Sequence, residues 1–243
     1  MKSEEFYSLS SVEKNHWFYS GKRAIVRYWI EQMGFLQPDL SLIEVGAGTG
    51  LFASEMHSHM KVVALDVNPI ALSLIRERNQ IPIISAMAEH LPIKSGSIDV
   101  ITALDVIEHI DDDRSALEGL VNATREGGII ILTVPAYPIL WSEWDIDLHH
   151  RRRYTYSDIL RLLTGLDVDI VHMSYINTAA FIPIIIYRFL MNFVTKNMTN
   201  RRMEEWIPYK PLNDLLRFIF VKPAQLKIFI PFGLSLLCIL RHQ

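Results

Sequence analysis

The most constraining feature of this sequence is the alternation of short apolar runs with helical stretches over residues 1 to about 175. The runs place Val, Ile and Leu at consecutive positions, which is typical of strands buried on both faces. Strands that alternate with helices form parallel sheets through right-handed crossovers, so we predict an α/β protein with an open sheet. The predicted strands are Leu42–Val45, Val62–Asp66, Ile81–Ala86, Ile98–Leu104 and Ile129–Val134, and the predicted helices are Gly50–His57, Pro69–Arg78 and Arg114–Thr124.

The amino-acid composition limits which functions and which cellular compartment are expected. Half of the 243 residues are apolar, which is enough for a large core. The 24 basic and 27 acidic residues give a net charge of −3, so the chain has no general field for polyanions and no nucleic-acid partner is expected. A single cysteine, Cys238, excludes an internal disulfide and predicts a reducing, cytoplasmic compartment. The charged N-terminus predicts no signal peptide.

A glycine-rich loop at 44–50, E-V-G-A-G-T-G, follows the first predicted strand and leads into a helix. Glycines allow a tight turn and let backbone N–H groups approach a ligand at the helix N-terminus. Asp66 ends the second predicted strand, 20 residues after Gly46, where a carboxylate can accept both hydroxyls of a ribose. A tight turn alone would explain the glycines, but the loop together with the acid favours a nucleotide-like ligand.

The loop differs from those that bind pyrophosphates and triphosphates. It reads G-x-G-x-G rather than G-x-G-x-x-G, and the sequence has no G-x-x-x-x-G-K-[ST] motif. Glu44 would repel a pyrophosphate, whereas it suits a cationic amino-acid ligand. S-adenosylmethionine (SAM), with its sulfonium and ammonium groups, is such a ligand.

The loop resembles the first motif, E/D-x-G-x-G-x-G, of the class I SAM-dependent methyltransferases. Similar stretches follow in the family's order: A-E-H-L-P at 88–92, S-I-D-V-I at 97–101, D-V-I-E-H at 105–109 and E-G-G at 126–128. The resemblance covers at least residues 41–173. It implies a seven-stranded Rossmann-like sheet with helices on both faces, and SAM as the cofactor.

The resemblance also implies a set of cofactor-binding residues. The loop glycines would surround the methionine part, Asp66 would bind the ribose and Val67 would pack on the adenine. The family often has an aspartate before Ala-Glu to receive the adenine amino group, but Met87 stands there, so adenine recognition is expected from the Ala88 backbone and Glu89. The full set is Arg23, Glu44, Gly46, Ala47, Gly48, Gly50, Asp66, Val67, Met87, Ala88, Glu89, Asp105 and Val106.

The N-terminal segment fits one branch of the same family. Residues 13–23, E-K-N-H-W-F-Y-S-G-K-R, are similar to an H-W-[WF]-x-x-G-[RK]-R pattern whose helix closes over the cofactor. Residues 1–40 are therefore predicted to form a helical lid. Arg23 is the predicted partner of the methionine carboxylate, because an arginine fork suits a carboxylate. The alternative is an amphipathic helix that packs its aromatic side chains on the sheet.

Two polar clusters follow predicted strand ends and are candidates for catalysis. Asp105, Glu108 and His109 follow the fourth strand, and spacings of three and four place them on one side of a helical turn. His149 and His150 follow the fifth strand. Methyl transfer requires donor and acceptor in line, and an alcohol or phenol acceptor also needs a base or a metal. The predicted catalytic residues are Glu108, His109, His149 and His150.

Two resemblances give these clusters different roles. D/E-x-x-E-H with a later histidine resembles the metal site of ubiquinone-type and small-RNA 2′-O-methyltransferases, and implies Mg²⁺, Mn²⁺ or Zn²⁺ on Asp105, Glu108, His109 and His149. The stretch V-P-A-Y-P-I-L-W-S at 134–142, followed by H-R-R-R-Y-T, instead resembles a glycan- and lipid-associated branch and makes His150 the equivalent residue. Either histidine could then act as a base without metal. A third interpretation is that Glu108 and His109 cap a helix and line the pocket.

The arginines that follow these histidines have two interpretations. Two of the three at 151–153 are predicted to lie at the surface and one to bind an anionic group of the substrate. The stretch 155–158, T-Y-S-D, matches a capping box, so a helix is predicted to begin there.

From Ile176 the chain becomes more apolar. Prolines and basic residues interrupt its two apolar runs, so neither predicts a membrane-spanning helix. Stretches 168–175 and 233–240 fit the family's sixth and seventh strands, the seventh antiparallel. The predicted organisation is a lid at 1–40, a cofactor-binding core at 41–175, a helical insertion at 176–232 over the acceptor site and a final strand at 233–243. The insertion suits an apolar acceptor or a membrane surface; packing on the core and a homodimer contact remain open alternatives.

These features together predict a SAM-dependent methyltransferase. The expected acceptor is an apolar or lipid-linked small molecule, methylated at a hydroxyl, and the expected location is the cytoplasm with peripheral contact to a membrane. An RNA 2′-O-methyltransferase is the first alternative, which the net charge and the apolar insertion disfavour. A non-catalytic SAM-binding regulatory protein is the second, which the intact loop and the polar clusters disfavour.

Overall fold

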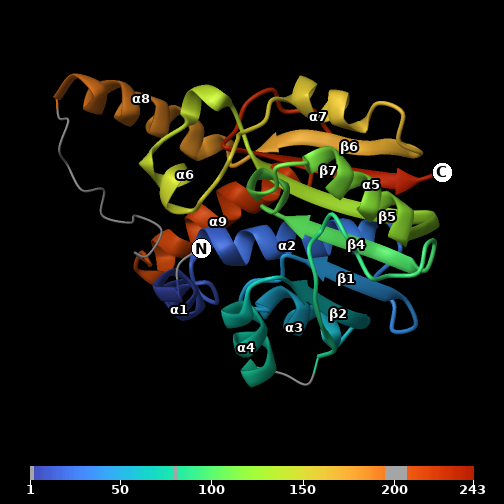
Figure 1. Cartoon of the computed structure of the whole chain (residues 1–243). Coiled ribbons are helices and arrows are strands. Elements are labelled where there is room, and N and C mark those ends of the chain that lie inside the picture. The colour runs from blue at the N-terminus through green and yellow to red at the C-terminus, as the bar shows by residue number, and fades with distance from the viewer. Residues whose placement is uncertain (1–2, 79–80, 195–206) are drawn as a thin grey trace.

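A seven-stranded mixed sheet organises the residues that this computed structural model describes, 3–78, 81–194 and 207–243 (Figure 1). The strand order is β3-β2-β1-β4-β5-β7-β6; the pairs from β3 to β5 are parallel and β7 is antiparallel to both neighbours. The predicted α/β class is confirmed. The strands are β1 (Ser41–Val45), β2 (Lys61–Asp66), β3 (Ile83–Ser85), β4 (Ile98–Leu104), β5 (Thr124–Pro135), β6 (Val168–Ile176) and β7 (Ser235–His242).

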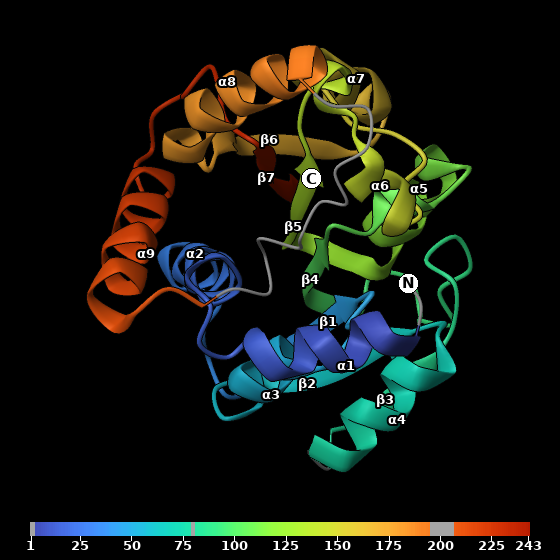
Figure 2. The same ribbon diagram turned by 90° about the vertical axis from the view of Figure 1, so that its left-hand side faces the viewer.

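Helices cover both faces of the sheet because alternate strand residues are apolar on each side. In β1, Leu42 faces the cluster formed with α2, α3 and α9, and Ile43 faces the cluster formed with α5 and α7. Figure 2 shows α2 between the sheet and α9. The helices are α1 (Ser3–Val12), α2 (Trp17–Gln32), α3 (Leu51–His57), α4 (Pro69–Arg78), α5 (Asp113–Ala123), α6 (Glu143–Asp147), α7 (Tyr156–Leu163), α8 (Thr178–Val194) and α9 (Lys210–Ala224), with 3₁₀ turns η1 (Ile107–His109) and η2 (Pro138–Leu140).

Element boundaries differ from the prediction in two strands. β3 is three residues long instead of six and forms the edge of the sheet, where a short strand limits exposed backbone pairing groups. β5 begins at Thr124, directly after α5, rather than at the predicted Ile129. A register shift in β4 between Ile98 and Val100 lets Thr124 pair with Ile98. The capping box is confirmed: Thr155 and Asp158 bond reciprocally and α7 follows.

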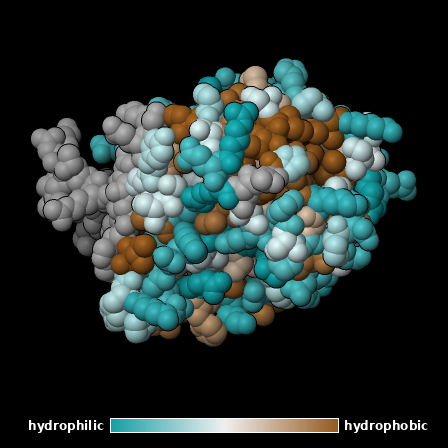
Figure 3. Space-filling view, turned by 90° about the horizontal axis from the view of Figure 1, so that it is seen from below, coloured by the Kyte–Doolittle hydropathy of each residue, from teal (hydrophilic) through white to brown (hydrophobic). Residues whose placement is uncertain are grey.

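The C-terminal part contains α8 and α9 between β6 and β7, within the predicted insertion. Residues 195–206 of that insertion lie outside the described residues. α9 packs along α2, and Trp29 Nε1 donates to the Ala224 carbonyl at 3.0 Å. Seen from below Figure 1, much of the surface is hydrophilic and apolar side chains gather in one broad area (Figure 3).

The helices of the described residues are too short or too polar for a bilayer. None of them is long and apolar enough to cross a membrane.

Candidate active site

The glycine loop and Asp66 form one hydrogen-bonded unit at the carboxyl ends of β1 and β2. Asp66 Oδ2 accepts from Gly48 N and Oδ1 accepts from Asn68 N, both at 2.8 Å. Burial raises the pKa of Asp66 despite these bonds. Gly46 has φ +66°, and a Cβ there would lie 2.5 Å from Val106 Cγ2, so both conformation and space require glycine.

Glu44 lies beneath this loop as a buried carboxyl group. Its Oε2 accepts from Ala53 N at 2.8 Å, in the first turn of α3. Burial raises its pKa to about 8, and the negative charges of Glu13 and Asp66 add to that rise. A cation placed beside Glu44 would favour its charged form, which agrees with the predicted cationic ligand.

We expect Glu44 to make stability fall as pH rises. Its pKa is raised from 4.5 to about 8, so its contribution is full below about 4.5 and is lost as pH rises through about 8. Glu44→Gln keeps an acceptor for Ala53 N but cannot ionise. Relative to wild type, this variant should gain stability, of the order of 3 kcal/mol, between those two pH values. Urea unfolding at a series of pH values checks this; a stability difference independent of pH would contradict it.

Two exposed apolar side chains flank Asp66. Val67 is 62% exposed and Met87 is 50% exposed. Each follows the end of a strand, and Asp66 pairs with Ser85 between β2 and β3, which brings the two segments to the same edge. Ala88 is buried and Glu89 is half-buried. The edge therefore offers an apolar surface next to a ribose-binding carboxylate.

Arg23 is buried, and two of its donor groups are already engaged. Its Nε donates to Glu55 Oε2 at 2.9 Å and its Nη1 to the Glu13 carbonyl at 2.8 Å. The Glu13 carboxylate in turn accepts from Thr49 Oγ1 and pairs with Arg78 at 2.7 Å. This network links the segment after α1 to the glycine loop and to α4, and no local sequence motif predicts it. Binding of a methionine carboxylate by Arg23 stays a prediction.

Asp105 directly follows β4 and carries an ion pair that the sequence analysis missed. Lys22, on α2, pairs with its Oδ2, and Thr133 Oγ1 donates to its Oδ1 at 2.9 Å. Burial raises the pKa of Asp105, but the Lys22 ammonium outweighs that effect and lowers it. Lys22 also lies 4.7 Å from the centre of the Phe18 ring. The lysine precedes Arg23 in the K-R pair of the N-terminal motif, which was its signal in the sequence.

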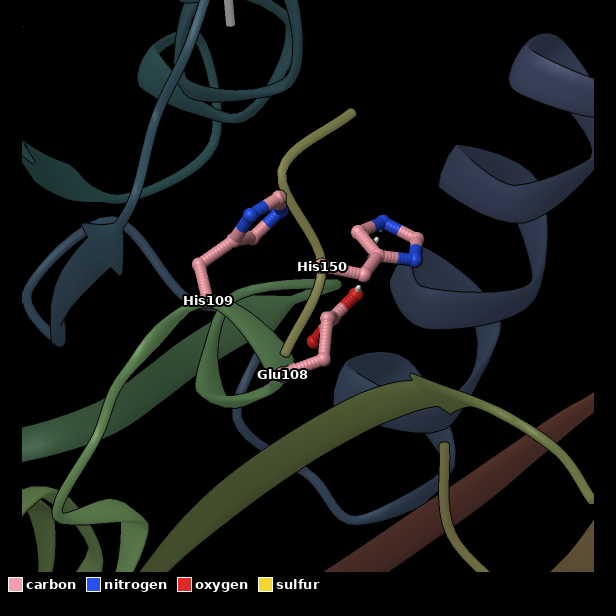
Figure 4. A group of neighbouring side chains, drawn as sticks. All are labelled: Glu108, His109 and His150. Carbon is pink, nitrogen blue, oxygen red and sulfur yellow. Dashed lines mark ion pairs between the residues drawn. The ribbon is translucent and has the colours of Figure 1, made fainter. Parts of the chain in front are cut away.

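Glu108, His109 and His150 form a compact polar cluster (Figure 4). One candidate ligand atom from each residue lies within 4.8 Å of the others. Glu108 is fully buried, and neither of its carboxylate oxygens has a hydrogen-bond partner among the described residues. Burial raises its pKa well above the usual range, and burial also lowers the pKa of His109 to about 4. The cluster therefore holds an uncompensated buried acid beside two imidazoles.

Asp145 orients His150 and was also missed. The His150 Nδ1 lies 2.9 Å from Asp145 Oδ1, so Nε2 faces Glu108 at 4.0 Å. Arg153 donates to both oxygens of Asp145, at 2.7 and 3.0 Å. Burial raises the pKa of Asp145, but the bonds to His150 and Arg153 outweigh it and lower the pKa to about 2. Asp145 closes a capping box with Ser142, and this S-x-x-D spacing was visible in the sequence.

The metal set predicted with His149 needs a correction. His149 is exposed and adopts φ +59° after α6, and its carbonyl rather than its ring contacts His109 Nδ1, at 3.3 Å. His150 takes its place in the cluster, which is the alternative given by the second resemblance. Asp105 lies outside this group, paired with Lys22 and Thr133.

The three arginines after the histidines all pair with carboxylates of the protein. Arg151 pairs with Asp111, Arg152 with Asp113 at 3.0 Å and Arg153 with the buried Asp145. The prediction that one of them is available for an anionic substrate group therefore has no support in these contacts.

The sheet order with an antiparallel β7, and the loop and Asp66 at its edge, define the class I methyltransferase fold. Residues 43–132 match the family model described as a methyltransferase domain. Over these residues the chain is similar to the class I SAM-dependent methyltransferases.

Individual relatives are distant. A malonyl-[acyl-carrier protein] O-methyltransferase of Serratia marcescens is 29% identical over 48% of this chain, and the match spans 49% of that protein. A ubiquinone biosynthesis O-methyltransferase of Rickettsia typhi is 23% identical over 72% of this chain and 82% of its own length. The N-methyltransferase NodS of Bradyrhizobium japonicum, solved with S-adenosyl-L-homocysteine, superposes with a TM-score of 0.57 at 13% identity, covering 93% of this chain and 87% of its own.

Proposed function

We propose that this protein transfers a methyl group from SAM to a hydroxyl of an apolar or lipid-linked small molecule. The observation that carries the proposal is a single edge of the sheet. That edge holds the unit of glycine loop and Asp66 after β1 and β2, and the cluster of Glu108, His109 and His150 beside β4 and β5. Ligands of open α/β sheets bind at this edge.

The cofactor roles follow from the contacts. Asp66 accepts the ribose hydroxyls while its bonds to Gly48 and Asn68 hold it in place. Val67 and Met87 pack on the adenine, and the cationic methionine end favours the charged form of Glu44. With SAM held by these residues, the cofactor would supply the methyl group to an acceptor bound at the polar cluster.

The chemistry is an in-line displacement. The acceptor oxygen forms the new O–CH₃ bond as the S–CH₃ bond breaks and S-adenosylhomocysteine leaves. His150 Nε2 accepts the hydroxyl proton, because Asp145 holds the Nδ1 side of the ring. The Asp145–Arg153 pair keeps that orientation fixed in the apo protein.

The same cluster fits a divalent cation. The buried Glu108 carboxylate lacks partners among the described residues, and His109 and His150 add two imidazole nitrogens near it. Carboxylate and imidazole suit Mn²⁺ or Zn²⁺, with Mg²⁺ preferring more oxygen ligands. A bound ion would acidify the acceptor hydroxyl.

Chelation distinguishes the two forms of this proposal. If a metal takes part, EDTA should abolish methyl transfer, and Mn²⁺ or Zn²⁺ should restore it in wild type but not in Glu108→Gln. Cofactor affinity, measured on the same samples, should stay unchanged because Glu108 forms no hydrogen bond to Asp66 or to the loop. Activity that survives EDTA unchanged would exclude the metal, and His150 would then act as the base without one.

The acceptor class rests on the apolar character of residues 176–232 and on the relatives. Two of these are named as O-methyltransferases, one of malonyl-[acyl-carrier protein] and the other of ubiquinone biosynthesis. The test supplies SAM with a labelled methyl group to total lipid extract and to total RNA, with Asp66→Ala as the control. Label in an organic-soluble product supports the proposal, and label confined to RNA overturns the acceptor. SAM binding without label in any pool favours the non-catalytic regulatory alternative.

A further inference from the structure

Exposed apolar side chains concentrate on one part of the molecule. Among the described residues, most of the large apolar side chains that are exposed lie between 182 and 232. On α9, Phe218 is 59% exposed, and Leu215 and Ile219 are exposed beside it. The opposite side of the helix carries Phe220 and Ala224, which are buried against α2. α9 is thus apolar on both sides, and within the described residues Leu215, Phe218 and Ile219 stay exposed.

The segment after α9 extends this apolar surface. Leu226, Ile228 and Phe229 are all exposed, although the segment is fixed in place. Ile230 N donates to Ser174 Oγ at 2.8 Å, and its carbonyl accepts from Tyr175 N on β6. Fixed, exposed aromatic and branched side chains of this kind mark an interaction surface rather than scattered surface residues.

Basic side chains border the same surface. A cavity of about 700 Å³ between α2 and α9 is lined by Lys14, Arg27, Lys210 and Arg217, together with the Arg23–Glu55 pair and Asp214. The first four form no ion pair within the described residues. Lys222 follows on α9, in a second hollow beside Phe218. The chain as a whole has a net charge of −3, so this local excess of cations contrasts with the rest of the molecule.

We propose that this α9 surface, comprising Leu215, Phe218, Ile219, Lys222, residues 226–229 and the basic cavity, docks on an anionic lipid bilayer. The apolar side chains enter the boundary between headgroups and acyl chains, as those of an interfacial amphipathic helix do. The basic cavity takes the phosphate of a lipid headgroup, and the other cations face the negative surface potential. In Figure 2, α9 lies on the side of α2 that faces away from the sheet.

Charge favours a bilayer over a second copy of this chain. A two-fold interface places the same patch on both subunits, so the cations Arg27, Lys210, Arg217 and Lys222 would face the same set of cations on the partner. Like charges at an interface oppose association. An anionic lipid surface satisfies both the apolar and the cationic parts.

Flotation with vesicles tests the proposal on the full chain. Wild type should float with phosphatidylcholine–phosphatidylglycerol vesicles, bind less in high salt and bind poorly to phosphatidylcholine alone. Arg27→Gln with Arg217→Gln should weaken binding about 25-fold, at about fivefold per charge. Leu215→Ser with Phe218→Ser should weaken it about tenfold or more.

Matched controls change exposed residues elsewhere. Lys61→Gln with Arg76→Gln removes two exposed charges from β2 and α4, and Leu160→Ser removes an exposed leucine from α7. These should bind vesicles like wild type, and thermal melting should show that every variant is folded. Lack of flotation, equal losses in test and control variants, or a dimer that Phe218→Ser dissociates would overturn the proposal. SAM binding is measured separately, so failure here leaves the proposed activity untouched.

Discussion

Replacement of Asp66 by alanine is expected to weaken SAM binding about 100-fold or more. Asp66 accepts two backbone hydrogen bonds, from Gly48 and Asn68, each at 2.8 Å, and each carboxylate oxygen keeps a further lone pair for a ribose hydroxyl. Hydrogen bonds to a charged group contribute about 1.5–3 kcal/mol each, so losing two ribose contacts alone accounts for that factor. The freed Gly48 N–H also loosens the loop. Isothermal titration of SAM measures the effect.

The control for this prediction removes a carboxylate that has no role in the loop. Asp39 is almost fully exposed and lies 4.0 Å from Lys61, so Asp39→Ala should bind SAM like wild type. Asp66→Asn keeps one acceptor and should fall between the two. Wild-type affinity for SAM in a folded Asp66→Ala protein would contradict the assignment of the nucleotide site, and the proposed function depends on that site.

The fold was predictable because its strands are buried on both faces and its helices carry clear end signals. β1, β2 and β4 begin within one residue of their predicted starts, and α4 matches exactly at Pro69. β3 was overestimated because an apolar run at a sheet edge pairs on one side only, and Pro82 precedes the three residues that pair. β5 was underestimated because pairing of Thr124 depends on a bulge in β4, which local sequence does not reveal.

The candidate site was predictable where its residues lie close together in the sequence. It was less predictable where contacts between separate segments decide which side chains meet. The glycine loop and Asp66 are strand-end features, and the spacing of Glu108 and His109 fits one short turn. Lys22 meets Asp105 across 83 residues of sequence, whereas Asp145 meets His150 only five residues away, through the turn that follows α6. The choice between His149 and His150 depends on a left-handed residue at 149, which turns one ring outward and the next inward.

The two adjacent histidines allow a matched test of catalysis, in which His150→Asn and His149→Asn are compared. His150→Asn should lower kcat about 100- to 10,000-fold, because the variant lacks the Nε2 that faces Glu108 and receives the acceptor proton. Asp145 keeps its bonds from Arg153, so the surrounding structure should persist. SAM affinity should stay at the wild-type value, since no loop contact changes.

His149→Asn is a suitable control because asparagine tolerates the φ of +59° found at this position. Its side chain is exposed and only its carbonyl contacts His109, so kcat should remain within a few-fold of wild type. Asp145→Asn supplies a third measurement: it should lower kcat and leave KM unchanged, because Asp145 positions His150 without touching the acceptor. Equal losses at 149 and 150 would mean that the cluster in Figure 4 does not take the proton, and catalysis would then depend on alignment of donor and acceptor.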